Sequence, residues 1–252
     1  MAKNISLEGK KSVVTGAAKG IGKSIATYFA ELGSDLALVD VDEVSLKETA
    51  EEIRGKGRRV YEIVADLTSL KDIERIARES VEKLGEVDVL VNNAGVSFLN
   101  PAEKLTEEEW DKTLAVNLKG LYFLSQAIGR HMIEKRSGKI VNIASQAAVV
   151  ALEGHVAYCA SKAGVVAVTK VLALEWGKYN INVNAIAPTI IMTPMGKKAW
   201  SGEKGRKMLE RIPLGRFGEP EEVAYTAAFL ASDLSDMITG TTIMVDGGYT
   251  IQ

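Results

Sequence analysis

SVVTGAAKGIGKSIATYFAELG, residues 12–33, is the stretch that decides how this chain of 252 residues folds. It begins with a short apolar run, continues through a glycine-rich loop and ends in a segment of helical periodicity that stops at Gly33. Glycines let the backbone approach a pyrophosphate, and the start of a helix offers unpaired N–H groups and a favourable dipole. The stretch therefore predicts a phosphate-binding turn, with the candidate cofactor contacts Gly16, Lys19, Gly20, Ile21 and Gly22.

The spacing of these glycines also allows a simpler interpretation. It reads GxxxGxG, whereas the usual dinucleotide-binding fingerprint is GxGxxG, and glycines between a strand and a helix can serve the turn alone. A predicted strand directly before the loop and a predicted helix directly after it are the context in which such a loop binds a cofactor. We therefore favour cofactor binding.

Short apolar runs rich in β-branched residues recur along the chain, with helix-like segments between them. They lie at residues 12–15, 36–40, 60–65, 87–92, 140–144, 181–187 and 242–245. This alternation predicts an α/β fold with a doubly wound sheet of about seven parallel strands and helices on both faces. We expect a single domain over residues 1–252, with its chemistry at the carboxyl ends of the strands.

The composition excludes several classes of function. The net charge of −2 offers no field for nucleic acid or membrane, and 46% hydrophobic residues can build one large core. The single cysteine forms no internal disulfide, and two histidines leave few ligands for a metal, so we expect a reducing compartment and no metal site. No apolar leader opens the sequence and no run approaches about 18 apolar residues, so we expect a cytoplasmic protein.

An acidic residue ends the second predicted strand. Asp40 comes 18 positions after Gly22, where a carboxylate can accept both hydroxyls of an adenosine ribose. It would repel a 2′-phosphate, which predicts NAD in preference to NADP. Two observations oppose this interpretation: Asp40 could instead cap a helix starting near Glu43, and Lys19 in the glycine loop could pair with a 2′-phosphate. We give Asp40 the greater weight.

The third and fourth predicted strands end in further polar residues. Asp66, followed by Leu67, is placed to bind the adenine amino group, although a cap for the helix over 69–84 explains it nearly as well. The fourth strand ends in an Asn-Asn-Ala-Gly sequence, whose small residues would let a flat ligand lie against the backbone; a simple turn is the alternative. The candidate cofactor contacts here are Asn93, Ala94 and Gly95.

The stretch SQAAVVALEGHVAYCASK, residues 145–162, holds a hydroxyl, a phenol and an amine at spacings that suit proton transfer. In a helix starting near His155, Tyr158 and Lys162 would stand four residues apart on one face. A neighbouring cation favours phenolate and lowers the pKa of the phenol, so Tyr158 is a candidate general base. Ser145 ends the fifth strand and can fold back towards it. A solvated helix and a turn serine are the simpler explanations.

A single amide interrupts an apolar helical face. Asn117 lies in AVNLKG, inside the helical region predicted over 107–135. Such an amide can distort the helix locally or hold a water, and a hydrogen-bonded core amide is the alternative.

Several of these motifs occur together in the order seen in one family. The chain resembles the short-chain dehydrogenase/reductase (SDR) family over its whole length, through TGAAKGIG at 15–22, NNAG at 92–95, Asn117, Ser145, YCASK at 158–162 and VDGGY at 245–249. The resemblance implies a Rossmann-like sheet, a nicotinamide cofactor and a catalytic tetrad of Asn117, Ser145, Tyr158 and Lys162. It also implies a homotetramer.

The roles that the resemblance implies fit the chemistry of these residues. Tyr158 takes the alcohol proton while hydride leaves for the nicotinamide, and Ser145 holds the substrate oxygen. Lys162 lowers the phenol pKa and binds the nicotinamide ribose, so Tyr158 and Lys162 also count as cofactor contacts. Asn117 keeps a water for proton relay. The contacts to the carboxamide map to Ile191 and Thr193.

The substrate site is predicted from fewer residues. The chain has Pro188-Thr189 where the family usually has Pro-Gly, so a hydroxyl would reach the nicotinamide pocket, and residues 194–218 would form a mobile substrate flap. The stretches around 145–162 and 187–195 are similar to those of polyol dehydrogenases in the family. The candidate substrate contacts are Ser145, Gln146, His155, Tyr158 and Thr189.

The sequence therefore predicts an NAD-dependent enzyme that interconverts a secondary alcohol, a polyol or sugar alcohol, and its ketone. The first alternative is an NADPH-dependent 3-oxoacyl carrier-protein reductase, for which Lys19 would be the receptor of the 2′-phosphate. The second is a non-enzymatic nucleotide-binding protein on the same fold.

Overall fold

The chain folds around one parallel sheet. The computed structural model describes residues 4–251. Seven parallel strands lie in the order β3-β2-β1-β4-β5-β6-β7. Their bounds are β1 Lys11–Thr15, β2 Asp35–Asp40, β3 Val60–Val64, β4 Val89–Asn92, β5 Gly138–Ile143, β6 Ile181–Pro188 and β7 Thr242–Val245. The predicted doubly wound sheet is confirmed, with strand ends that differ from the predicted ones by up to two residues.

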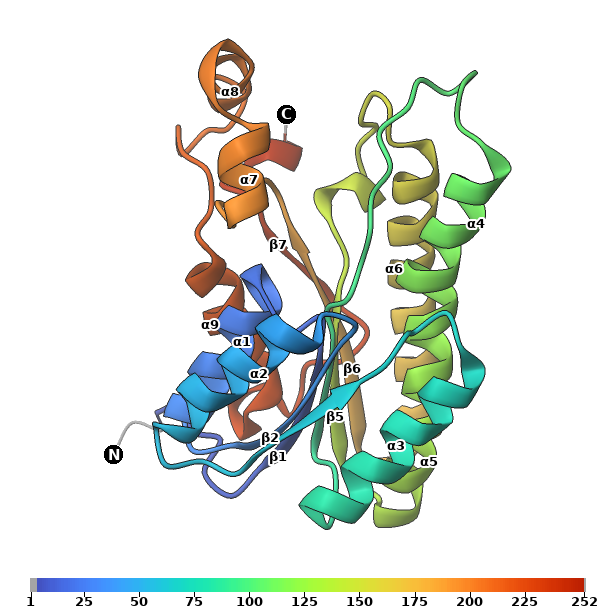
Figure 1. Cartoon of the computed structure of the whole chain (residues 1–252), viewed down its shortest axis with the longest axis vertical. Coiled ribbons are helices and arrows are strands. Elements are labelled where there is room, and N and C mark those ends of the chain that lie inside the picture. The colour runs from blue at the N-terminus through green and yellow to red at the C-terminus, as the bar shows by residue number, and fades with distance from the viewer. Residues whose placement is uncertain (1–3, 252) are drawn as a thin grey trace.

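Helices cover both faces of this sheet, as Figure 1 shows. One face carries α1 (Gly20–Glu31), α2 (Glu43–Arg54) and α9 (Pro220–Ala231). The other carries α3 (Leu70–Leu84), α4 (Glu107–Leu114), α5 (Leu121–Lys135) and α6 (Val156–Trp176). Strands buried from both sides explain why the apolar runs in the sequence are continuous and not alternating.

The strand order reverses between β1 and β4, which pair side by side. The chain leaves β1 towards α1 on one face, whereas it leaves β4 towards α4 on the other. Loops that diverge in this way open a crevice at the carboxyl ends of the strands, where ligands bind in this type of fold. The predicted glycine loop and the Asn-Asn-Ala-Gly sequence both lie at this point.

Two short helices, α7 (Pro194–Ala199) and α8 (Gly202–Leu209), stand beyond this end of the sheet (Figure 1). The base of their segment is closed by backbone hydrogen bonds, from Met192 N to Gly218 O at 2.8 Å and from Gly218 N to Ile190 O at 3.0 Å. Apolar side chains from this segment pack against the C-terminal turn and the loop after β5, in a cluster of Ile190, Met208, Ile212, Tyr249, Val150, Trp200 and Phe217. The segment is therefore attached both at its base and through apolar contacts.

One expectation about hydropathy needs correction. Within residues 4–251, Val156–Tyr179 is long and apolar enough to cross a membrane by length and composition, with a mean hydropathy of 1.4. From the sequence we expected no such run. In the fold this helix packs against β5 and β6 and buries Val165, Leu172 and Ala173. Packing against the sheet accounts for part of this composition, because 39% of the most apolar window of the helix is buried in the fold.

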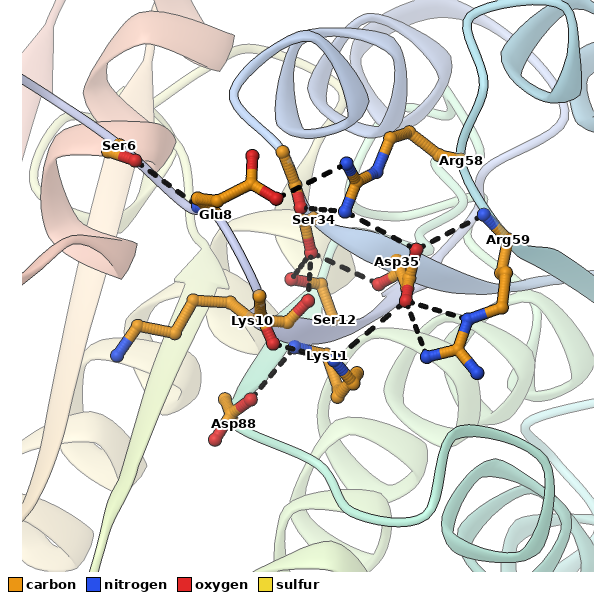
Figure 2. A network of polar contacts seen from close by, with 12 residues as sticks. Ser6, Glu8, Lys10, Lys11, Ser12, Ser34, Asp35, Arg58, Arg59 and Asp88 are labelled. Carbon is orange, nitrogen blue, oxygen red and sulfur yellow. Dashed lines mark hydrogen bonds and ion pairs between the residues drawn. The ribbon is translucent and has the colours of Figure 1, made fainter.

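A network of charges lies at the amino ends of the strands, opposite the crevice (Figure 2). Its centre is Asp35 at the start of β2, which is only 6% exposed. The Asp35 carboxylate forms ion pairs with Arg59 at 2.8 Å, Arg58 at 3.5 Å and Lys11 at 3.8 Å. Burial alone would raise the pKa of this carboxyl, but the hydrogen bonds and charges of the two arginines outweigh it and hold the pKa below its ordinary value.

We expect Asp35→Asn to lower the free energy of unfolding by about 2 kcal/mol at neutral pH, because Lys11, Arg58 and Arg59 lose their buried partner. The loss stays moderate because the Arg59 side chain is exposed to water. A carboxyl with a depressed folded-state pKa stabilises the protein above its ordinary pKa, and the contribution is lost as the pH falls through the folded value. Urea unfolding of both proteins at neutral and acidic pH checks this. Glu43→Gln, which breaks the exposed pair with Lys47, is the control and should change stability by less than about 0.5 kcal/mol.

Candidate active site

The hydroxyl, phenol and amine of residues 145–162 lie together at the carboxyl end of β5. α6 begins at Val156, so Tyr158 and Lys162 stand one turn apart on the same face. The Lys162 ammonium lies 5.6 Å from the centre of the Tyr158 ring and donates a hydrogen bond to Ile143 O at 2.7 Å. Ser145, two residues after that carbonyl, lies near enough to the phenol to act on its pKa. The end of β5 therefore fixes the amine and the serine relative to the phenol.

The protonation states differ from the simple expectation. Burial raises the pKa of the Tyr158 phenol above its ordinary value, although the hydrogen bond with Ser145 acts in the opposite direction. Burial likewise lowers the pKa of Lys162, to about 8. From the sequence we expected the ammonium to lower the phenol pKa. In the structure desolvation of the phenol dominates instead, because the ammonium is directed at the Ile143 carbonyl and is itself desolvated.

Asn117 lies in a π-helical turn, Ala115–Gly120, between α4 and α5, so the predicted local distortion of the helix is present. Its side chain is fully buried and engaged by protein atoms. Oδ1 accepts from Val96 N at 2.8 Å, and Nδ2 donates to Val96 O at 2.9 Å and to Ser161 Oγ at 3.1 Å. The amide therefore positions the site, as in the alternative that we considered, and the relay water that the resemblance implies stays a prediction.

Ser161 is a site residue that sequence reasoning missed. Its hydroxyl accepts from Asn117 and donates to Tyr158 O at 2.7 Å, which joins the π-helical turn to the catalytic helix. The only signal in the sequence was its place one turn after Tyr158. Gly95 lies close to two members of the tetrad: a Cβ added there would lie 3.3 Å from Asn117 Oδ1 and 3.7 Å from Lys162 Nζ. The Asn-Asn-Ala-Gly sequence thus meets the tetrad.

The glycine loop is held by the loop after β4. Asn93 Nδ2 donates to Thr15 O at 2.9 Å and to Gly16 O at 3.1 Å, while Thr15 Oγ1 accepts from Asn93 N and Ala94 N at 3.0 and 3.1 Å. Gly16 has a left-handed φ of 64°, and a Cβ on Gly22 would lie 2.0 Å from Gly16 O. The side chain of Asn93 therefore shapes the loop, a role that the sequence analysis did not assign to it.

The start of α1 suits a phosphate. α2, α3 and α4 each begin with a side chain that caps their first turn, whereas α1, which starts at Gly20, has no side-chain cap. Gly20 is also left-handed, and a Cβ there would lie 3.1 Å from Thr193 Cγ2. Thr193 thus borders the glycine loop, while Ile21 packs partly buried against the core. An uncapped helix start beside a glycine turn fits the pyrophosphate of a dinucleotide.

Asp40 lies beside this loop at the end of β2. Its Oδ2 accepts from Ala18 N at 3.0 Å and its Oδ1 from Asp42 N at 3.1 Å. It does not cap α2, so that alternative is wrong: Asp42 is the cap and accepts from Ser45 N at 3.1 Å. Asp42 also forms an ion pair with Lys19 at 2.6 Å. The only basic residue of the glycine loop is therefore already paired with an acid.

The remaining cofactor candidates take less prominent positions. Asp66 is exposed and accepts from Thr68 N at 2.8 Å, while Ser69 caps α3, so the alternative role of Asp66 as the cap is wrong. Leu67 is buried, and a Cβ on Gly120 would lie 2.6 Å from Leu67 O. Ile191, at the base of the segment 194–218, forms a bridge with Gly218, and its carbonyl accepts from Thr193 N at 2.8 Å.

The substrate candidates lie on different segments around the end of the sheet. His155 lies against Tyr158, with ring centres 6.1 Å apart in an edge-on arrangement. Gln146 is 4% exposed, and its Oε1 is buried without a hydrogen-bond partner. Thr189, however, lines a cavity of about 550 Å³ between β7, α9 and the end of the segment 194–218, whose lining includes neither Ser145 nor Tyr158. The structure thus places His155 beside Tyr158 and Gln146 directly after Ser145, and the substrate role of all three new candidates stays a prediction.

Comparison with known proteins defines the class. A family model described as Enoyl-(Acyl carrier protein) reductase matches residues 16–250. Together with the parallel sheet, the glycine loop and the tetrad, this match shows that the chain belongs to the short-chain dehydrogenase/reductase family, and it is an oxidoreductase.

Individual relatives are similar over nearly their whole length. The chain is 51% identical to an NAD-dependent glycerol dehydrogenase of Listeria innocua, covering 99% of this chain and 97% of that protein. It is 46% identical to a D-threitol dehydrogenase of Mycolicibacterium smegmatis, covering 98% and 95%. A crystal structure of NAD+-bound xylitol dehydrogenase superposes with a TM-score of 0.93 at 30% identity, covering 98% of this chain and 100% of that one.

Proposed function

We propose that the protein is an NAD-dependent dehydrogenase that oxidises a secondary alcohol of a polyol to the ketone. The observation that carries the proposal is the placement of Ser145, Tyr158 and Lys162 at one strand end, beside a glycine loop that is bordered by Asp40. A carboxylate there accepts hydrogen bonds from ribose hydroxyls and repels a 2′-phosphate. The names of the similar glycerol and threitol dehydrogenases support both the cofactor and the substrate class.

The cofactor residues fit a dinucleotide, with the glycine loop and the start of α1 at its phosphates and Asp40 at a ribose. When bound, NAD supplies a nicotinamide ring that accepts hydride from the carbinol carbon. Tyr158 takes the proton of the alcohol, and the Ser145 hydroxyl holds the alcohol oxygen towards the phenol. Lys162 provides positive charge behind the phenolate, and the Ser161 hydroxyl joins Asn117 to the backbone of Tyr158.

We assign recognition of the polyol to Gln146 and His155. The buried Gln146 Oε1 has no partner in the protein, and an unpaired buried acceptor costs free energy unless a ligand hydroxyl donates to it. A site built in this way rejects analogues that lack the hydroxyl. The segment 194–218 covers the site and excludes water. Thr189, whose Oγ1 is likewise buried without a partner and which lines the cavity between β7 and α9, stays a further candidate for this set.

A panel of initial rates tests the proposed function. We expect purified protein to form NADH from NAD with glycerol, threitol or xylitol, and kcat/KM to be at least about tenfold lower with NADP. A simple secondary alcohol with a single hydroxyl is the control for polyol recognition and should react at least about tenfold more slowly. Faster turnover of a 3-oxoacyl thioester with NADPH would replace the proposal with the reductase function.

We further propose a cytoplasmic homotetramer. A groove of about 760 Å³ runs between the π-helical turn and α6, lined by residues that include Leu118, Tyr122 and Ala167. Further along α6, Leu174 is 84% exposed and Val171 51% exposed. Apolar helix faces of this kind pair across a two-fold axis in symmetric oligomers. Light scattering after size-exclusion chromatography measures the mass directly.

A further inference from the structure

We infer that Asp42 selects the cofactor, by holding Lys19 so that this lysine cannot receive a 2′-phosphate. The inference rests on the proposed binding of a dinucleotide at the glycine loop. Asp42 caps α2, far along the chain from the catalytic helix, and it lies beyond the strand-end position that Asp40 occupies. It thus adds a second acidic group to the discrimination between NAD and NADP.

The contacts of Asp42 fix it firmly. Its Oδ1 accepts from Ser45 N at 3.1 Å, and its Oδ2 accepts from Ser45 Oγ at 2.9 Å. Its own N–H donates to Asp40 Oδ1 at 3.1 Å, which joins the two acidic residues into one unit. The hydrogen bond from Lys19, together with those from Ser45, lowers the pKa of the Asp42 carboxyl to about 2. Asp42 is therefore charged at every physiological pH.

The same contacts decide what Lys19 can do. Its ammonium is 2.6 Å from Asp42 Oδ2, and the two side chains are 68% and 37% exposed. An exposed pair of this kind adds little to stability, so its consequence lies in the local charge. Asp40, Asp42 and Lys19 together carry a net charge of −1 beside the glycine loop. Removing the Asp42 charge brings the sum to zero and leaves an unpaired ammonium on the loop.

The test compares NADH and NADPH binding to Asp42→Asn by fluorescence titration. Asparagine is as good a helix cap as aspartate, so α2 keeps its first turn while the charge is lost. We expect the ratio of Kd for NADPH to Kd for NADH to fall about tenfold relative to the wild type. The ratio of kcat/KM for NADP and NAD with a polyol should shift in the same direction.

Glu43→Gln is the matched control. Glu43 is the next residue along the chain and forms a comparable exposed ion pair at 2.7 Å, but its partner is Lys47 on α2 and not a residue of the glycine loop. We expect this variant to leave the ratio of the two dissociation constants unchanged. An equal shift in Glu43→Gln would overturn the inference, because it would show that any lost negative charge suffices.

A double variant isolates the role of the lysine. We expect Lys19→Ala in the Asp42→Asn background to cancel the gain in NADPH affinity. The inference is wrong if the gain persists without the lysine, or if Asp42→Asn alone leaves the ratio at the wild-type value. Asp42→Ser, which also keeps a helix cap, repeats the test should the asparagine variant unfold. Because these are binding measurements, they remain decisive even if no polyol is turned over, which would contradict the proposed function alone.

Discussion

Tyr158→Phe is expected to lower kcat for polyol oxidation by about 10³-fold, because the variant keeps the half-buried ring and loses the group that accepts the alcohol proton. Phenylalanine preserves the edge-on contact with His155, so the fold should be unchanged. NADH binding, measured by fluorescence titration, should stay within about threefold of the wild type. The effect should therefore appear in turnover.

Tyr179→Phe is the control for the loss of a tyrosine hydroxyl. Tyr179 lies in the turn after α6, at the opposite end of that helix, where its ring contacts Arg136. Its hydroxyl is remote from the tetrad, and we expect full activity. Turnover by Tyr158→Phe within about tenfold of the wild type would remove Tyr158 from the role of general base.

Lys162→Met is expected to lower kcat/KM by about 100-fold, because the site loses the ammonium that lies 5.6 Å from the centre of the Tyr158 ring. Methionine approximates the length of lysine without its charge. Lysine carries a folded-state pKa of about 8 here, below its ordinary value of 10.5. Between these two values the unfolded chain holds a proton that the folded chain does not, so raising the pH favours the folded state.

This linkage gives a second readout for the same variant. The stability of the wild type relative to Lys162→Met should rise between pH 8 and pH 10.5, by about 3 kcal/mol in total. Urea unfolding of both proteins across this range measures the difference. A difference in stability that does not change with pH would show that burial does not lower the pKa of Lys162. Turnover by Lys162→Met at the wild-type rate would show that the lysine takes no part in catalysis.

The fold could be predicted well because its signals are local. Seven apolar runs were found at the places where the strands lie, since strands buried on both faces leave a continuous signal in the sequence. The positions of Asp40 and Ser145 followed from the same rule, because each ends a strand and functional groups gather at that edge. The spacing of Tyr158 and Lys162 needed only the period of a helix.

What could not be predicted depends on contacts between distant segments. Asn93 shapes the glycine loop because β4 lies beside β1, a pairing that no single stretch of sequence specifies. The hydrogen bonds of Asn117 to Val96 and Ser161 likewise require three segments to meet. The raised pKa of Tyr158 follows from desolvation, which only the packed structure contains.

The most direct test of the proposed mechanism is the pH dependence of NAD reduction by a polyol, measured as kcat/KM for the wild type. Oxidation needs Tyr158 as phenolate, and the pKa of the phenol is raised above its ordinary value, so we expect the rate to rise with pH from about pH 6 to about pH 9. The reverse reaction uses the protonated phenol and should not rise over this range. An oxidation rate that stays constant from acidic to alkaline pH would contradict the assignment of Tyr158 as the base.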